Sequence, residues 1–110
     1  MTALLLIGPE LAADPDLSAL QERLRLRGAA CVAVEALSAK VLLRAASSGP
    51  AWLATNDAAA VPAAATAGLV GVVLIGLSGE DRDEGVLVRH APDLAGAPIA
   101  MVPRAGGCWH

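Results

Sequence analysis

Three short polar segments, each placed after an apolar run, carry the groups that could do chemistry in this chain. They are Gly8-Pro9-Glu10, Thr55-Asn56-Asp57 and the segment 76–81, which reads GLSGED. A hydroxyl, an amide and the free N–H groups at the start of a helix can hold a small anion. The same residue types also form an ordinary helix N-cap, so the Thr-Asn-Asp segment fits either a ligand site or a cap. Glu10 fits either a site carboxylate or a plain loop residue before a helix.

A second set of chemically capable side chains lies at the C-terminal end, which reads GGCWH. Cys108 and His110 form a Cys-x-His pair, and a thiolate with an imidazole suits Zn or Cu. Completing such a site would need His90 and a carboxylate such as Asp81, or a second tail contributed across a dimer. In the alternative interpretation Trp109 packs the tail into an apolar groove, and the neighbouring thiol is an ordinary one.

The elements that must position these residues alternate along the chain. Runs of apolar residues predict strands, and leucines at helical spacing predict a helix over 14–27, where Asp14-Pro15 provides a cap followed by proline in the first turn. Ser38 caps a second expected helix that ends before Gly49, and Asn56 or Asp57 caps a third that ends at Gly68. The expected strands are 3–7, 29–37, 51–55, 69–76, 86–91 and 98–102, with a polar loop over 77–85.

Strands that alternate with helices imply right-handed crossovers and a mostly parallel sheet. We therefore predict a three-layer α/β domain with helices on both faces of the sheet over residues 1–103, followed by a tail over 104–110. In such sheets ligands lie beyond the carboxyl ends of the strands. We expect the three polar segments to converge there, which gives a candidate ligand-binding set of Gly8, Glu10, Thr55, Asn56 and Gly76.

Composition limits the classes of partner. The 110 residues carry a net charge of −3, so no basic surface is available for nucleic acid. The chain is 55% hydrophobic but has no Phe and no Tyr, so we expect a core of smaller side chains and a homodimer formed through a leftover apolar face. The uncharged stretch 58–79 contains Pro62 and Gly68 and fits a buried helix and strand better than a membrane span. Two cysteines suggest no disulfide framework and a reducing cytoplasm, and Cys31, in a presumed core strand, is not expected to bind metal.

The stretch AWLATNDAAA, with the segments around it over residues 38–96, resembles the haloacid dehalogenase (HAD) phosphatase superfamily. In that family an apolar strand ends in Ser or Thr, often as Thr-Asn, and a helix follows directly. The resemblance implies that Thr55 holds a phosphoryl oxygen and that Asn56 starts the helix whose N–H groups favour an anion. It also implies an Asp-x-Asp after the first strand, with one carboxylate as nucleophile. This chain has Gly8 in the nucleophile's position and Glu10 in the second, and glycine cannot attack phosphorus.

Other parts of the family pattern are also missing. After the fourth strand the family offers acidic residues for Mg²⁺, whereas here Gly76-Leu77 come first and the acidic residues Glu80, Asp81 and Asp83 follow in a loop. That acidic run fits a solvated loop as well as a cation site. The family's basic residue has no clear counterpart, since Lys40 precedes the Thr-Asn pair.

Taken together, these patterns favour a degenerate, non-catalytic HAD-like module that binds a small anion or a protein partner. Two alternatives stay open. One is a residual Mg-dependent phosphohydrolase that uses Glu10 and the carboxylates of segment 80–83. The other is a metal-binding protein that holds Zn or Cu through Cys108, His110 and His90.

Overall fold

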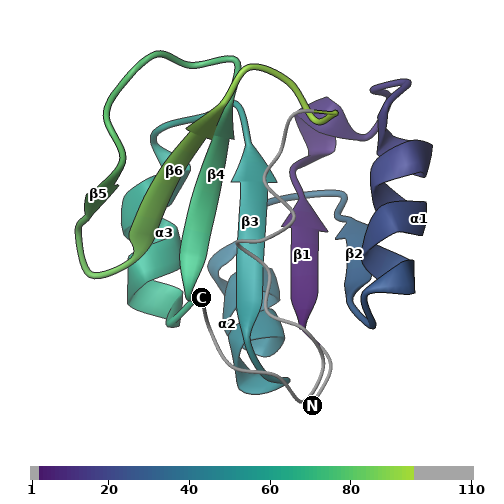
Figure 1. Ribbon diagram of the computed structural model, residues 1–110. Coiled ribbons are helices and arrows are strands. Elements are labelled where there is room, and N and C mark those ends of the chain that lie inside the picture. The colour runs from purple at the N-terminus through teal and green to yellow at the C-terminus, as the bar shows by residue number, and fades with distance from the viewer. Residues whose placement is uncertain (1–2, 96–110) are drawn as a thin grey trace.

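Six strands form one sheet in the computed structural model, which describes residues 3–95. The strand order is β2-β1-β3-β4-β6-β5 (Figure 1). Neighbouring strands run parallel, except that the short edge strand β5 pairs antiparallel with β6. The predicted α/β class with a mostly parallel sheet is therefore confirmed. The strands are β1 (Leu4–Ile7), β2 (Ala30–Ala33), β3 (Ala51–Thr55), β4 (Gly71–Ile75), β5 (Arg82–Asp83) and β6 (Leu87–Ala91).

Three α-helices connect the first four strands in turn. They are α1 (Leu17–Leu26), α2 (Ala39–Ser47) and α3 (Ala60–Ala67), and a short 3-10 turn, Pro9–Leu11, follows β1. The Ser38 hydroxyl accepts a hydrogen bond from the Val41 N–H at 3.2 Å, which is the predicted N-cap of α2. Gly68 ends α3 in a left-handed conformation with φ 87°. Sequence and structure agree at both helix ends.

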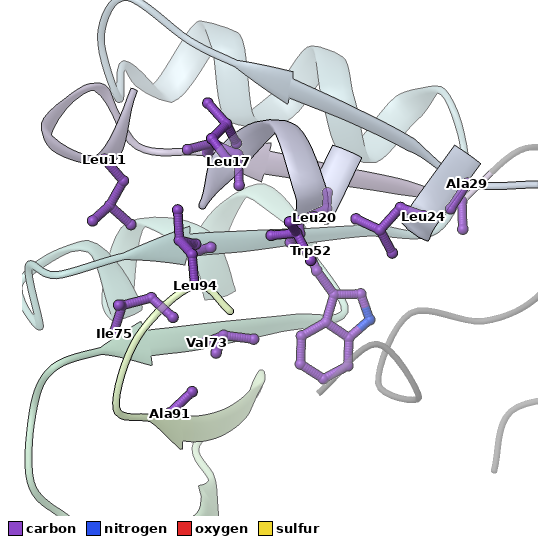
Figure 2. Close-up of a cluster of buried hydrophobic side chains, with 14 residues drawn as sticks. Leu11, Leu17, Leu20, Leu24, Ala29, Trp52, Val73, Ile75, Ala91 and Leu94 are labelled. Atoms are coloured by element: carbon purple, nitrogen blue, oxygen red, sulfur yellow. The ribbon is translucent and has the colours of Figure 1, made fainter. Parts of the chain in front are cut away.

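Each face of the sheet has its own buried cluster. On one face α1 contributes its leucine stripe, Leu17, Leu20 and Leu24, to a cluster that also holds Trp52 (Figure 2). The second cluster combines residues of α2 and α3 with the alternate residues of the same strands, such as Leu53. Successive side chains of a strand point to opposite faces, and both faces of the sheet are covered here. Strand β3 is therefore buried at all of its positions. No helix in the described residues is long and apolar enough to cross a membrane.

Several element boundaries differ from the sequence prediction. Helix α1 begins at Leu17 rather than Asp14, because the Asp14 carboxylate accepts a hydrogen bond from the Asp16 N–H at 2.8 Å and holds a turn there. Strand β2 is shorter than the expected 29–37 because, among the described strands, it pairs only with β1, and the chain leaves the sheet after Ala33. Part of the expected loop 77–85 forms β5. The expected strand 98–102 lies outside the described residues.

The largest fully buried side chain, Trp52, depends on a glycine in the neighbouring strand. Trp52 of β3 is paired with Gly71 of β4, and it is 2% exposed. A Cβ on Gly71 would lie 2.2 Å from Cζ3 of the indole ring. The ring therefore lies directly against the backbone of β4, which only a residue without a side chain permits.

We expect Gly71→Ala to lower the free energy of unfolding by about 1–3 kcal/mol, since the new methyl group overpacks a buried ring. Urea unfolding followed by circular dichroism measures the change. In a Trp52→Leu background the same substitution should cost clearly less, because the clash has been removed. Equal costs in both backgrounds would contradict the packing described.

Candidate functional site at the carboxyl ends of the strands

The path of the chain across the sheet changes direction between β1 and β3. The connection from β1 leads to β2 on one side of β1, whereas the following strand, β3, lies on its other side. Such a change of direction is where open α/β sheets receive ligands, beyond the carboxyl ends of the two strands. Glu10 follows β1 and Thr55 ends β3, so two of the predicted site residues meet at this position.

A hydrogen-bonded cluster of Glu10, Thr55 and Asn56, which we call the Glu10 cluster, fills this corner. The Thr55 hydroxyl donates a hydrogen bond to Oε1 of Glu10, and the Asn56 N–H donates to the same oxygen at 3.1 Å. The Asp57 N–H in turn donates to Oγ1 of Thr55 at 3.1 Å. Thr55 is fully buried, and both its donor and its acceptor functions are satisfied. The Glu10 carboxylate therefore accepts the hydrogen bonds that the Thr55 hydroxyl and the Asn56 N–H were predicted to donate to an anion.

Gly8 lies beneath this carboxylate, as its predicted place in the site requires. A Cβ on Gly8 would lie 2.6 Å from Oε1 of Glu10. The Gly8 N–H donates to the Ala54 carbonyl at 2.8 Å, which extends the pairing of β1 with β3 up to the cluster. Gly8 thus supplies space for Glu10 to fold back over the strand ends.

The surroundings of Glu10 favour its ionised form. Partial burial raises the pKa of this carboxyl, but hydrogen bonds from the Thr55 hydroxyl and from the backbone N–H groups of Glu10 and Asn56 outweigh burial, so the pKa lies below its ordinary value of 4.5. A carboxylate with a lowered pKa is a weak base, and Oε1 of Glu10 already accepts two hydrogen bonds.

Asp57 shows what the rest of the Thr-Asn-Asp segment does. Its Oδ1 accepts a hydrogen bond from the Ala59 N–H at 3.0 Å, which closes a turn before α3. Helix α3 begins at Ala60, about one turn later than a cap at Asn56 or Asp57 predicts. The segment therefore acts as a turn that satisfies backbone donors.

Gly76, the fifth predicted site residue, belongs to a second corner, at the ends of β4 and β6. Its N–H donates to the Ala91 carbonyl at 2.8 Å. A surface pocket of about 410 Å³ opens here, which we call the His90 pocket. It is lined by Gly76, Leu77, Ser78, Gly79, His90, Ala91 and Pro92.

His90 and Asp81, which the sequence pairs as possible metal ligands, are in contact beside this pocket. Oδ1 of Asp81 accepts a hydrogen bond from the His90 N–H at 3.1 Å and lies 3.3 Å from Nδ1 of the imidazole. The His90 side chain is 12% exposed, and that of Asp81 is 55% exposed. Nε of Arg89 lies 4.0 Å from the other carboxylate oxygen of Asp81.

The remaining acidic residues of the segment do not form a cation site. Glu84 is paired with Arg82 at 2.6 Å, and Oδ1 of Asp83 accepts a hydrogen bond from the Gly85 N–H at 3.2 Å. Within residues 3–95, no group of three or more His, Cys, Asp or Glu side chains could hold a metal ion. Glu10 and the 80–83 carboxylates, required by the phosphohydrolase alternative, are thus not gathered into a metal centre in this part of the chain.

The cysteines bear on the Zn or Cu prediction. Burial raises the pKa of the Cys31 thiol to about 11, which agrees with leaving it out of a metal site, since a thiolate is the binding form. Cys108 and His110 lie outside the described residues. Metal binding through these two and His90 therefore stays a prediction.

Sequence reasoning missed two features of the site. It placed Glu10 and Thr55 in one candidate set, but it did not predict that the Thr55 hydroxyl donates a hydrogen bond to Glu10. It also missed Ser78 and Gly79 as walls of a pocket around His90. The signal for the second corner was a glycine-rich segment followed at short distance by a strand that ends in histidine.

The comparisons with known proteins add no relative. No family model matches the chain, and no curated protein and no solved structure matches it either. The geometry of the two corners is therefore the basis for the function.

We expect Glu10 to make the stability of the protein depend on pH in the acid range. Since its folded pKa lies below 4.5, the native state holds fewer protons on this group than the unfolded state does. The contribution is complete above 4.5 and is lost as pH falls through the folded pKa. Urea unfolding at a series of pH values should show a smaller loss of stability on acidification for Glu10→Gln and Thr55→Val than for wild type.

The matched control is Glu35→Gln, which removes an exposed glutamate after β2. It should keep the wild-type slope of stability against pH. A Glu10→Gln profile that runs parallel to wild type through the acid range would refute the role given to these hydrogen bonds.

Proposed function

We propose that this protein is a small, non-catalytic, HAD-like or Rossmann-like binding and interaction module that receives a small anion at the carboxyl edge of its sheet. The single observation that carries the non-catalytic part of the proposal is the Glu10 cluster, because it occupies the corner where a phosphohydrolase would keep its reactive carboxylate. The three-layer arrangement expected for such folds is part of the proposal. Its support is that α1 packs in one buried cluster while α2 and α3 pack in the other.

The absence of a nucleophile at the tip of β1 supports a binding role. Gly8 stands where a phosphoenzyme-forming side chain would be needed, and it is buried. Glu10 is the carboxylate at this corner, and its Oε1 accepts hydrogen bonds from Thr55 and Asn56. A carboxylate that accepts two hydrogen bonds is less nucleophilic and less basic than a free one. Phosphoryl transfer through Glu10 is thus disfavoured.

An anion fits the neighbouring part of the same edge better than the Glu10 cluster. The donors of Thr55 and Asn56 are occupied, and the Glu10 carboxylate would repel a second negative charge there. Gly76 was predicted as a site residue and lines the His90 pocket. This pocket has the imidazole and the Ser78 hydroxyl as polar groups.

An interaction role has its own support in exposed apolar side chains. Leu26 at the end of α1 is 72% exposed, Val32 in the edge strand β2 is 47% exposed, and Leu43 of α2 is 58% exposed. Contact with another chain would remove these apolar side chains from water. A homodimer accordingly stays part of the proposal.

The proposal is tested by measuring binding and turnover on the full chain. Isothermal titration calorimetry should detect inorganic phosphate, whereas an aryl phosphate incubated with Mg²⁺ should give no product above the buffer rate. Glu10→Gln should leave this background unchanged. Mg-dependent turnover that disappears in Glu10→Gln but persists in the matched Glu35→Gln variant would establish the phosphohydrolase alternative instead.

A further inference from the structure

The contact with Asp81 determines which ring nitrogen of His90 can accept a hydrogen bond. Because an ionised carboxylate can only accept hydrogen bonds, the contact between Asp81 and Nδ1 puts the ring proton on Nδ1. In the neutral imidazole Nε2 then carries a lone pair and no proton. The same oxygen of Asp81 also accepts a hydrogen bond from the His90 backbone N–H, so it contacts both the backbone and the ring of this residue.

Space beside this nitrogen is kept open by a glycine. A Cβ on Gly79 would lie 2.7 Å from Nε2 and 3.2 Å from Cε1 of His90. Any side chain at this position would fill the volume next to the acceptor atom. Gly79 and His90 both line the pocket.

The charged groups around the ring set a condition on the ligand. Asp81 from the segment before β5 touches the ring, and Glu80 beside it is exposed. The positive group nearest to this carboxylate in the described residues is Arg89, at 4.0 Å. A fully ionised anion would meet both the lone pair of Nε2 and the charge of Asp81. An anion that keeps one proton of its own can instead donate it to Nε2, while its other oxygens accept from the Ser78 hydroxyl.

We propose that the His90 pocket selects a protonated oxyanion, a phosphate group that carries a P–OH, with Nε2 of His90 as the acceptor and Asp81 as the residue that positions it. This inference rests on the proposed function and names the chemistry of its anion. A phosphate satisfies the pocket because it brings the proton that the site lacks. Sulfate, of the same shape and charge but without a proton, leaves the acceptor unpaired, and a site built for a donor rejects such an analogue strongly.

Inorganic phosphate and sulfate are the two probes, titrated by calorimetry into the full chain at equal ionic strength. At a pH of about 7.5, phosphate still carries a proton and sulfate does not. The expected dissociation constant for sulfate is at least about tenfold higher than that for phosphate. His90→Gln should bring the ratio close to one, since an amide can donate to either ion. Gly79→Ala should weaken phosphate binding by filling the space beside Nε2.

Asp81→Asn and Asp83→Asn form a matched pair, because each removes one negative charge from the same acidic segment. Only Asp81 touches the imidazole, whereas Asp83 accepts from the Gly85 N–H. Asp81→Asn should lower the preference for phosphate, and Asp83→Asn should keep it. The ratio of the sulfate to the phosphate dissociation constant separates a positioning role of Asp81 from a general change in charge or stability.

The outcomes separate this inference from the function on which it rests. Phosphate binding that discriminates poorly against sulfate, or that survives in His90→Gln and is lost in Glu10→Gln, would overturn the inference and leave an anion-binding module. Failure of the chain to bind either ion would overturn both. Selective binding that depends on His90 and Asp81 would support both.

Discussion

The hydrogen bond between Thr55 and Glu10 is the constraint on which the organisation of the carboxyl edge depends. It joins the exits of two neighbouring parallel strands, β1 and β3, at the point where the chain changes direction across the sheet. Thr55 is fully buried, and a buried hydroxyl without a partner would cost about 1–3 kcal/mol. Glu10 can reach it because Gly8 has no side chain in the way. The turn after β1 and the turn before α3 are thereby fixed relative to each other.

This arrangement places a negative charge of the chain where a ligand's negative charge was expected. The Asn56 N–H and the Thr55 hydroxyl are the donors that an anion would use, and Glu10 accepts from both. Coulomb repulsion in a partly buried place is much larger than in water, so a second anion is excluded from the same spot. Glu10 thus supplies the negative charge at this corner, and in the proposed function the anion binds at the next corner instead.

The sequence predicts the parts of the fold that rest on local patterns. Ser38 and Gly68 mark helix ends correctly because capping is decided within a few residues. The α/β class follows from the alternation of apolar runs and helical spacing. The extent of β2 could not be predicted, because it depends on pairing with β1, the one neighbour that β2 has within residues 3–95.

In the candidate site, too, the sequence predicts which residues take part but not the contacts between them. Gly8, Glu10, Thr55 and Asn56 were predicted as one set from their place after strands, and the structure brings them together. The sequence does not reveal that Glu10 would accept the donors of the others, because that depends on how the 3-10 turn folds back. Gly76 was assigned to the same set but lines the neighbouring pocket.

The short strand β5 explains how the second corner is built. It has two residues, both exposed, and so adds little to the core. Its antiparallel register with β6 pairs Arg82 with Val88, which puts the preceding residue, Asp81, beside the end of β6. Asp81 therefore reaches both the backbone and the ring of His90. Gly79, in the chain between β4 and β5, leaves the space beside Nε2 of the imidazole free of a side chain. A strand that contributes little burial thus places Asp81 where its carboxylate contacts Nδ1 of His90 and fixes the tautomer of the imidazole.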